Sequence, residues 1–148
     1  MYPLFSDEYY MQLAINEAIT ATEKDEIPVG AIIVCQNQIV AKAHNQTQQL
    51  TDVTAHAEIL AITAAASYLN NKYLKDCTLY VTLEPCIMCA GALYWAQLGR
   101  LVYGASDEKR GYSLLNKSIL HPKTVVSKGV LQAENEEMIK NFFRRLRT

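Results

Sequence analysis

Hydrophobic and polar positions follow two different periods along the chain, and these periods predict both helices and strands. From Ser6 onwards, apolar residues recur every three or four positions, which predicts a helix that ends before Pro28. β-Branched residues dominate positions 29–34, and a polar turn at 36–38 leads into a second apolar stretch at 39–41. This part of the chain is therefore expected to form a β-hairpin.

The pattern beyond the hairpin predicts alternating helices and strands. Residues 45–54 are polar and are expected to form a loop. A hairpin followed by alternating strands and helices is typical of a mixed sheet of about five strands with helices on both faces. We therefore expect an α/β protein with three layers, α/β/α. The further predicted elements are helices over 55–69, 85–97 and 134–147 and strands over 78–83, 101–104 and 124–126.

Size and composition restrict the class of protein. The chain has 148 residues, half of them hydrophobic and 20% charged, without a repeat or linker, which predicts a single domain over residues 1–148. The longest uncharged apolar run, 86–96, has 11 residues, whereas a membrane-spanning helix needs about 20. Asp7 and Glu8 stand where a secretory signal carries positive charge. We expect a cytoplasmic protein that has no membrane partner.

Charge is divided unequally along the chain. Residues 1–98 carry four lysines and no arginine against ten acidic residues, a balance of −6. Residues 99–148 carry ten basic and five acidic residues, a balance of +5, which leaves the formal net charge at −1. Such asymmetry is typical of a protein with a polyanionic partner, and a solvated charged face produces it as well.

Two of the four cysteines follow a predicted strand in the sequence Pro85-Cys86-Ile87-Met88-Cys89. Proline favours the first helical position, and residues three apart share one side of a helix, so both sulfurs can reach one metal ion. A helix N-terminus also lowers the pKa of a thiol, which favours the thiolate that binds metals. By itself the pair is also consistent with a redox motif or with core thiols.

A third candidate ligand, His56, lies thirty residues upstream of Cys86. One histidine and two cysteines leave the fourth position of a zinc ion open, as in catalytic zinc sites. Glu58 is interpreted as a proton shuttle, because two thiolates already neutralise Zn²⁺ and a carboxylate beside a zinc-bound water can accept its proton. Alone, His56 is consistent with a structural histidine and Glu58 with a solvated residue, but the joint pattern favours a catalytic zinc site.

The pattern His56-x-Glu58 with Pro85-Cys86-x-x-Cys89 is the known signature of zinc-dependent nucleobase deaminases. Longer segments extend the match, so that the chain from about residue 8 to 147 resembles the bacterial tRNA-specific adenosine deaminases (TadA type). These segments are 27–31, 41–45, 54–59, 79–92, 104–107 and 141–144, and the stretch 79–92 is the most specific.

The resemblance implies a cytidine-deaminase-like fold and a homodimer with one Zn²⁺ per subunit. It implies conversion of adenosine to inosine at the wobble position of a tRNA anticodon, with the anticodon stem-loop as partner. Under this reading Glu58 moves protons, while His56, Cys86 and Cys89 bind the metal. The base must leave the stack of the unpaired anticodon loop to reach a buried metal.

The resemblance also implies a set of substrate contacts. Asn45 matches an asparagine that hydrogen-bonds the flipped nucleoside, and Val29 and Ala57 line the base pocket. The backbone near Pro85 helps to hold the reacting water, and Asp107 matches a position beside the anticodon loop. Ser106 departs from the family, which often has arginine there.

Several residues keep two interpretations. The Phe142–Phe143 pair is consistent with packing of the last helix or with stacking on RNA. We favour packing for one ring, and RNA contact for Phe143, Arg144 and Arg145. Tyr94 and Trp95 fit either the core or a dimer interface, and Cys35 and Cys77 are expected to be core thiols of strands. Glu84 has no role that the sequence assigns.

Two other functions compete with tRNA deamination. The same zinc site suits the deamination of a free base or nucleoside such as guanine, cytosine or cytidine. A structural zinc in an RNA-binding module is the second alternative, and Glu58 disfavours it because a structural site needs no proton shuttle. The basic half of the chain favours RNA over a free base.

Overall fold

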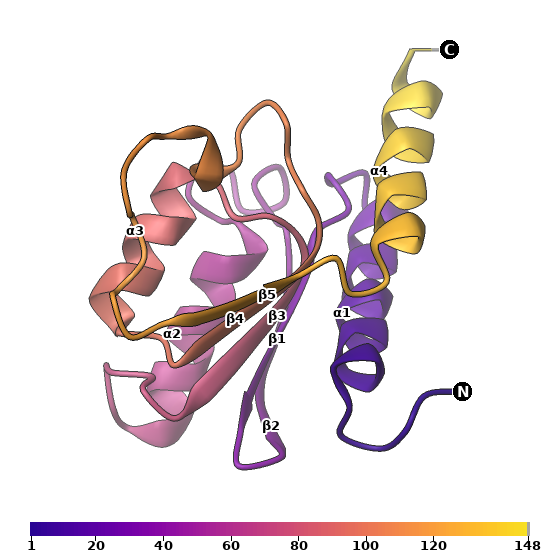
Figure 1. Cartoon of the computed structure of the whole chain (residues 1–148). Coiled ribbons are helices and arrows are strands. Elements are labelled where there is room, and N and C mark those ends of the chain that lie inside the picture. Colours follow the sequence, from indigo (N-terminus) through magenta and orange to yellow (C-terminus); the bar gives the residue numbers. More distant parts are fainter. Residues whose placement is uncertain (148) are drawn as a thin grey trace.

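The structure, a computed structural model, describes residues 1–147. A five-stranded sheet forms its centre, with helices packed on both faces (Figure 1). The helices are α1 (Asp7–Glu23), α2 (Ala57–Leu69), α3 (Ile87–Ala96) and α4 (Gln132–Leu146), with a 3-10 turn η1 (Tyr112–Leu114), and the strands are β1 (Gly30–Cys35), β2 (Gln38–His44), β3 (Cys77–Leu83), β4 (Arg100–Ala105) and β5 (Val125–Lys128).

The strands are ordered β2-β1-β3-β4-β5. β1 pairs antiparallel with β2 and β3, whereas β3, β4 and β5 are parallel to one another. Helices α2 and α3 cover one face, and α1 and α4 cover the other (Figure 1). The expectation of a mixed five-stranded sheet in a three-layer α/β/α arrangement is confirmed.

Two predicted helices begin two residues later than expected, and the difference matters for the site. His56 and Cys86 have extended backbones, with ψ of 151° and 175°, and they are the N-cap residues of α2 and α3. An N-cap residue lies outside the helix and still accepts its first hydrogen bond, here from Leu60 N to His56 O at 3.0 Å and from Ala90 N to Cys86 O at 2.8 Å. Both residues therefore lie at the N-terminus of a helix.

The sheet has an apolar layer on each face. Ile33, Leu79 and Leu101 are buried in the layer shared with α2 and α3, while Ile32 and Val102 are buried in the layer shared with α1. At the edge of the second layer, a side chain on Gly30 would overlap the α1 backbone. Glycine in the segment 27–31 thus lets α1 lie close to the start of β1.

The outward side of α3 carries two aromatic side chains that are exposed to different degrees. Trp95 is 77% exposed and Tyr94 is 40% exposed, so the expectation that they could belong to the core is wrong for Trp95. Within residues 1–147, the helices are too short or too polar to cross a membrane.

Candidate metal centre

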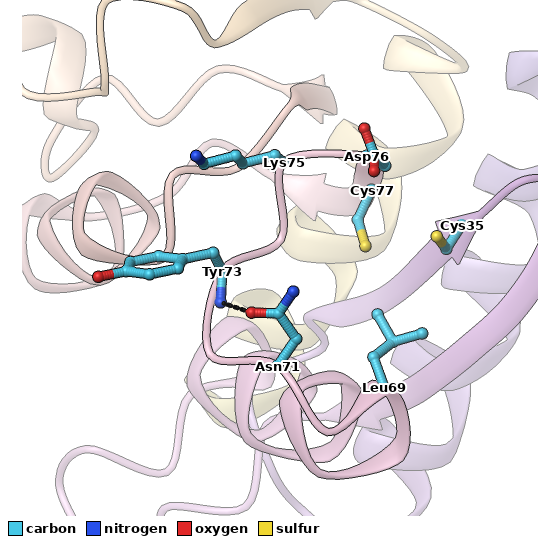
Figure 2. A pocket seen from close by; sticks show the side chains of 7 residues that line it. All are labelled: Cys35, Leu69, Asn71, Tyr73, Lys75, Asp76 and Cys77. Atoms are coloured by element: carbon cyan, nitrogen blue, oxygen red, sulfur yellow. Dashed lines mark hydrogen bonds between the residues drawn. The ribbon is translucent and has the colours of Figure 1, made fainter.

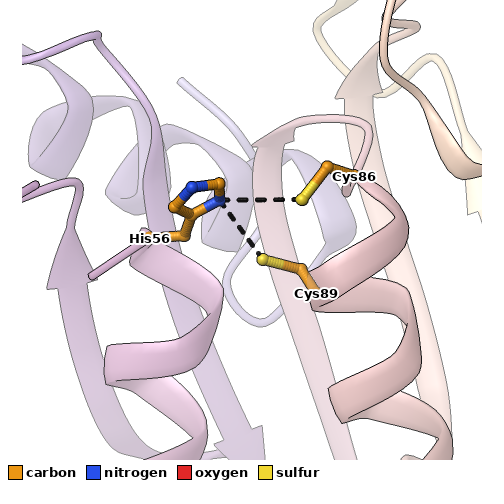
Figure 3. Close-up of side chains that lie close together, drawn as sticks. All are labelled: His56, Cys86 and Cys89. Atoms are coloured by element: carbon orange, nitrogen blue, oxygen red, sulfur yellow. Dashed lines mark hydrogen bonds between the residues drawn. The ribbon is translucent and has the colours of Figure 1, made fainter. Parts of the chain in front are cut away.

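The structure brings His56, Cys86 and Cys89 together from two different helices. The Nδ1 atom of His56 lies 3.7 Å from Sγ of Cys86 and 3.5 Å from Sγ of Cys89 (Figure 3). All three ligand atoms lie within 4.8 Å of one another, which makes this group able to hold a metal ion. The predicted convergence of the three side chains is therefore present, although thirty residues separate the histidine from the cysteines.

Local backbone structure explains this convergence. His56 ends a turn in which the Asp52 carboxylate accepts hydrogen bonds from Thr54 N at 2.8 Å and Thr54 Oγ1 at 2.7 Å. Cys86 is the N-cap residue of α3, and Cys89 lies in the first turn of the helix and is fully buried. Because the N-termini of α2 and α3 adjoin, the positive ends of two helix dipoles favour thiolates at this point.

The three side chains of the cluster shift one another's pKa values. Cys89, and secondarily His56, lower the pKa of the Cys86 thiol to about 4. Hydrogen bonding to Cys86, together with burial, raises the pKa of the Cys89 thiol. The Cys86 sulfur also raises the pKa of His56. A divalent metal ion bound here would favour the thiolate form of both cysteines.

Glu58 lies in the first turn of α2 and is only 4% exposed. Burial is the largest effect on its carboxyl and raises the pKa to about 7, and the nearby Cys86 sulfur acts in the same direction. A carboxyl with this pKa exchanges protons readily near neutral pH. The environment of Glu58 thus suits the role of proton carrier that the sequence predicted.

Three of the predicted substrate residues lie at the same end of the sheet. Asn45 follows β2 and donates its backbone N–H to the Val29 carbonyl at 3.0 Å, which joins the two segments beside the start of β1. Asn45 is 6% exposed, Val29 is half-buried, and Ala57 is fully buried next to His56. Their roles in binding a base stay predictions.

Asp107 and Pro85 lie in two loops beside the centre, which follow β4 and β3, respectively. The Asp107 carboxylate accepts the backbone N–H groups of Lys109 and Arg110, both at 3.1 Å, so it organises its own turn. The Pro85 carbonyl accepts the N–H of Tyr112 at 3.0 Å. This hydrogen bond holds residues 107–112 next to the N-terminus of α3.

Sequence reasoning missed the residue that holds this loop. Glu84 is 3% exposed, and its carboxylate accepts the backbone N–H groups of Asp107 and Ser113, each at 3.0 Å. A side chain on Gly111 would overlap this carboxylate. The sequence carried one signal, an acidic residue between an apolar strand and the proline before Cys86, but it could not show the burial.

A second buried acid holds the loop between Asn45 and His56. Glu26 is 1% exposed, and its carboxylate accepts the N–H groups of Gln48 at 3.1 Å and Gln49 at 2.7 Å. Each of the two loops that flank the candidate centre is therefore fastened by a buried carboxylate.

The predicted RNA-contacting residues lie at the end of α4. Phe142 is 5% exposed and Phe143 is 37% exposed, so one ring packs and the other faces outward, as favoured. Arg144 donates to Asn141 Oδ1 at 3.1 Å, and Arg145 lies 4.0 Å from Asp25 and over the Phe142 ring. Asp25 precedes β1, so this end of α4 adjoins the end of the sheet that carries Val29 and Asn45.

Comparison with known proteins connects this arrangement to a family of enzymes. The MafB19-like deaminase family matches residues 5–147. A protein of Aquifex aeolicus (strain VF5), named tRNA-specific adenosine deaminase, is 44% identical over 145 residues, covering 95% of either chain.

Two solved structures have folds similar to that of this chain. One, from a study of A-to-I editing by tRNA:A34 deaminases at the wobble position of transfer RNA, has a TM-score of 0.83 and 41% identity, covering 88% of this chain and 98% of its own. A guanine deaminase from Bacillus subtilis has a TM-score of 0.66 and 38% identity, covering 69% of this chain and 66% of its own.

Proposed function

The chain belongs to the family of tRNA-specific adenosine deaminases, and on this premise we propose that it hydrolyses adenosine to inosine at the wobble position of a tRNA anticodon. One observation carries the proposal: the His56, Cys86 and Cys89 cluster adjoins the buried carboxyl of Glu58. A metal-binding cluster beside a carboxyl with a pKa of about 7 is the machinery that hydrolytic deamination requires.

Zinc is the metal that we propose, with one ion per chain held by His56, Cys86 and Cys89. Zinc bonds of about 2.1 Å to nitrogen and about 2.3 Å to sulfur, at tetrahedral angles, separate the ligand atoms by about 3.6 Å. The observed distances of 3.5 and 3.7 Å between Nδ1 and the two sulfurs fit this geometry. When bound, zinc supplies a Lewis acid that makes water a stronger acid.

Glu58 performs the proton transfers in the proposed reaction. Its buried carboxylate accepts a proton from the attacking water, because a pKa of about 7 leaves it partly ionised at neutral pH. The carboxyl gives this proton to the adenine ring nitrogen, and it then takes the remaining proton from the hydroxyl added to the ring carbon and passes it to the departing amino group, which leaves as ammonia. Asn45, Val29 and Ala57 bind the extruded nucleoside in this proposal, and the backbone at Pro85 positions the water.

The RNA approaches the end of the sheet at which Asn45 and Val29 lie. Asp107 and the C-terminal end of α4, with Phe143, Arg144 and Arg145, contact the anticodon stem-loop in this proposal. The contact of Arg145 with Asp25 supports this position for the basic end of α4. Residues 1–148 act as one deaminase domain, and the four free cysteines fit the reducing cytoplasm.

A homodimer through α3 is part of the proposal. Ile87 and Tyr94, like Met88 and Trp95, are seven residues apart, so the four side chains form one stripe along the helix. Exposed apolar patches of this kind mark interaction surfaces. Sedimentation should show that Trp95→Glu dissociates the dimer, whereas the same change at exposed Leu4 leaves it intact.

The decisive assay offers two kinds of substrate to the zinc-loaded protein. One is an anticodon stem-loop with adenosine at the wobble position, and the other is free guanine, cytosine or adenine. We expect inosine and ammonia from the RNA and no ammonia from the free bases, with Glu58→Gln as the inactive control. Turnover of guanine without turnover of the RNA would replace this proposal with free-base deamination.

A further inference from the structure

Two cysteines lie outside the candidate metal centre, at the opposite end of the sheet. Cys35 is the last residue of β1, and Cys77 is the first residue of β3. The two are directly opposite each other in the antiparallel pairing of these strands. Cys86 follows the other end of β3, and the seven residues of that strand span roughly 20 Å. The pair is therefore separate from the metal ligands.

Strand geometry brings the two thiols close together. Gly30 N donates to Thr82 Oγ1 at 3.1 Å, so the N–H of Gly30 faces β3. Because backbone N–H groups alternate in direction along a strand, Cys35 points its N–H away from β3. Cys77 N also donates elsewhere, to Leu74 O at 3.2 Å. The two cysteines thus form a non-hydrogen-bonded pair, whose Cα atoms lie about 4.5 Å apart.

This separation lies within the range of about 4.4–6.8 Å that a disulfide requires. Figure 2 shows the two sulfur atoms directed toward the same space between the strands. Cys77 is 2% exposed, and burial raises the pKa of its thiol to about 12, with the Cys35 thiol acting in the same direction. Cys35 is half-buried and is the thiol that solvent reaches.

A pocket gives small molecules access to the pair. It has a volume of about 300 Å³ and is open to solvent (Figure 2). Both thiols line it, together with the segment that connects α2 to β3. A hydroperoxide is small enough to enter this space. The lining residues are Cys35, Leu69, Asn71, Tyr73, Lys75, Asp76 and Cys77.

We propose that Cys35 and Cys77 form a redox-modification site in which a hydroperoxide oxidises the pair to a cross-strand disulfide. With hydrogen peroxide, the simplest hydroperoxide, the Cys35 sulfur attacks one oxygen and breaks the O–O bond, which gives a sulfenic acid and one molecule of water. The Cys77 sulfur then displaces the sulfenic hydroxyl as a second water and forms the S–S bond. Two electrons pass from the thiols to the peroxide, and cellular thiols reverse the reaction.

The disulfide stabilises the fold and does not affect deamination at the metal centre. It closes a loop of about 40 residues in the unfolded chain, which raises Tm by an amount on the order of 10 °C. The metal ligands lie at the other end of β3, so oxidation of this pair is expected to leave zinc content and the rate of RNA deamination unchanged.

The test treats the zinc-loaded protein with hydrogen peroxide and measures intact mass, peptide linkage and Tm. We expect a loss of about 2 Da for the two thiol hydrogens, a peptide linking Cys35 to Cys77, a higher Tm, and reversal of all three by a dithiol reductant. Cys35→Ser and Cys77→Ala should each abolish these changes while keeping the deaminase activity.

Three results would overturn the inference. They are stable oxidation of Cys35 without a link, a link that includes Cys86 or Cys89, and a link between two chains. Cys35→Ser alters a half-buried position and Cys77→Ala a buried one, so a folding defect in one variant leaves the other as the control. None of these outcomes depends on which substrate the enzyme deaminates.

Discussion

Glu58 and Glu84 show that burial alone does not decide what an acidic residue does. They are 4% and 3% exposed, respectively. Two backbone N–H groups hydrogen-bond to the carboxylate of Glu84, and this satisfies its charge and fastens a loop. Glu58 lies beside two sulfurs, and burial raises its pKa to about 7. The difference in their partners makes Glu84 a structural group and suits Glu58 to the proposed role of proton carrier.

Glu58→Gln should lower the rate of deamination by about 10²- to 10⁴-fold, the usual contribution of general acid–base catalysis. The amide keeps the size of the side chain and removes its ability to carry a proton. Zinc content, measured by elemental analysis, should stay at one ion per chain. Glu8→Gln, a change to an acidic residue in the first turn of α1, is the control and should have full activity.

Retention of activity in Glu58→Gln would assign the proton transfer to another group. Loss of zinc together with activity would show that Glu58 supports the metal instead of moving protons.

At the scale of elements, the site is formed by the N-termini of two helices and by the loops beside them. α2 and α3 each place a candidate metal ligand at the N-cap, where the backbone is extended and the helix dipole is positive. The loops that follow β2 and β4 lie beside these N-termini, and the buried carboxylates of Glu26 and Glu84 hold them. The geometry of the centre therefore depends on contacts between elements.

Glu84→Gln tests the loop that carries Asp107. A glutamine side chain offers one oxygen to two backbone N–H groups, and leaving one of them unpaired costs about 1–3 kcal/mol. We expect KM for the anticodon stem-loop to rise more than kcat falls, at a temperature well below Tm. Glu108→Gln, in the same loop and exposed, is the control. An unchanged KM with a lower Tm would limit Glu84 to stability.

The anchoring of α1 predicts a pH dependence of stability. Arg100 on β4 donates to both oxygens of Asp7 at 2.8 and 2.7 Å, and Tyr80 donates to Asp7 at 2.9 Å. Hydrogen bonding to Arg100 lowers the pKa of the Asp7 carboxyl below its ordinary value of 3.8. The stabilisation is therefore complete above pH 3.8 and is lost as the pH falls through the lowered pKa.

Asp7→Asn should lower Tm at pH 7, and the difference from the wild type should shrink as the pH falls below 3.8. Thermal unfolding followed by circular dichroism between pH 7 and pH 2 measures both. Asp76→Asn, at an exposed position just before β3, controls for the loss of one carboxylate. A constant difference across this range would show that Asp7 contributes through helix capping or packing instead of charge.

At the scale of the whole molecule, the chemistry and the positive charge lie in different parts of the chain. All four residues of the candidate centre fall within residues 1–98, which have a balance of −6, whereas residues 99–148 have a balance of +5. The fold brings the parts together, because the end of α4 contacts the segment before β1. A polyanion bound there is expected to lose affinity as salt increases.

Arg144→Ala should weaken binding of the anticodon stem-loop and make the slope of log affinity against log salt concentration shallower by about 0.7–0.9. Zinc content and Tm should be unchanged, because the Arg144 side chain is exposed and, within residues 1–147, hydrogen-bonds to the side chain of Asn141 alone. Lys42→Ala removes the same charge from the acidic half, at an exposed position of β2, and should leave the slope unaltered. An equal effect of both variants would show that net charge decides binding, not its position.

The sequence by itself determined the elements and the candidate chemistry, because helix and strand periods, capping residues and ligand spacing are local properties. The bounds of the four helices and five strands in residues 1–147 were predicted to within a few residues. The sequence also predicted the candidate site residues His56, Glu58, Cys86 and Cys89. The tertiary structure decided the rest: the distances between Nδ1 and the two sulfurs, the burial that raises the pKa of Glu58, and the contacts of Glu84. It also decided that Cys35 of β1 lies directly opposite Cys77 of the neighbouring strand β3. Each of these depends on strand register or on packing between residues far apart in the chain, which no local pattern records.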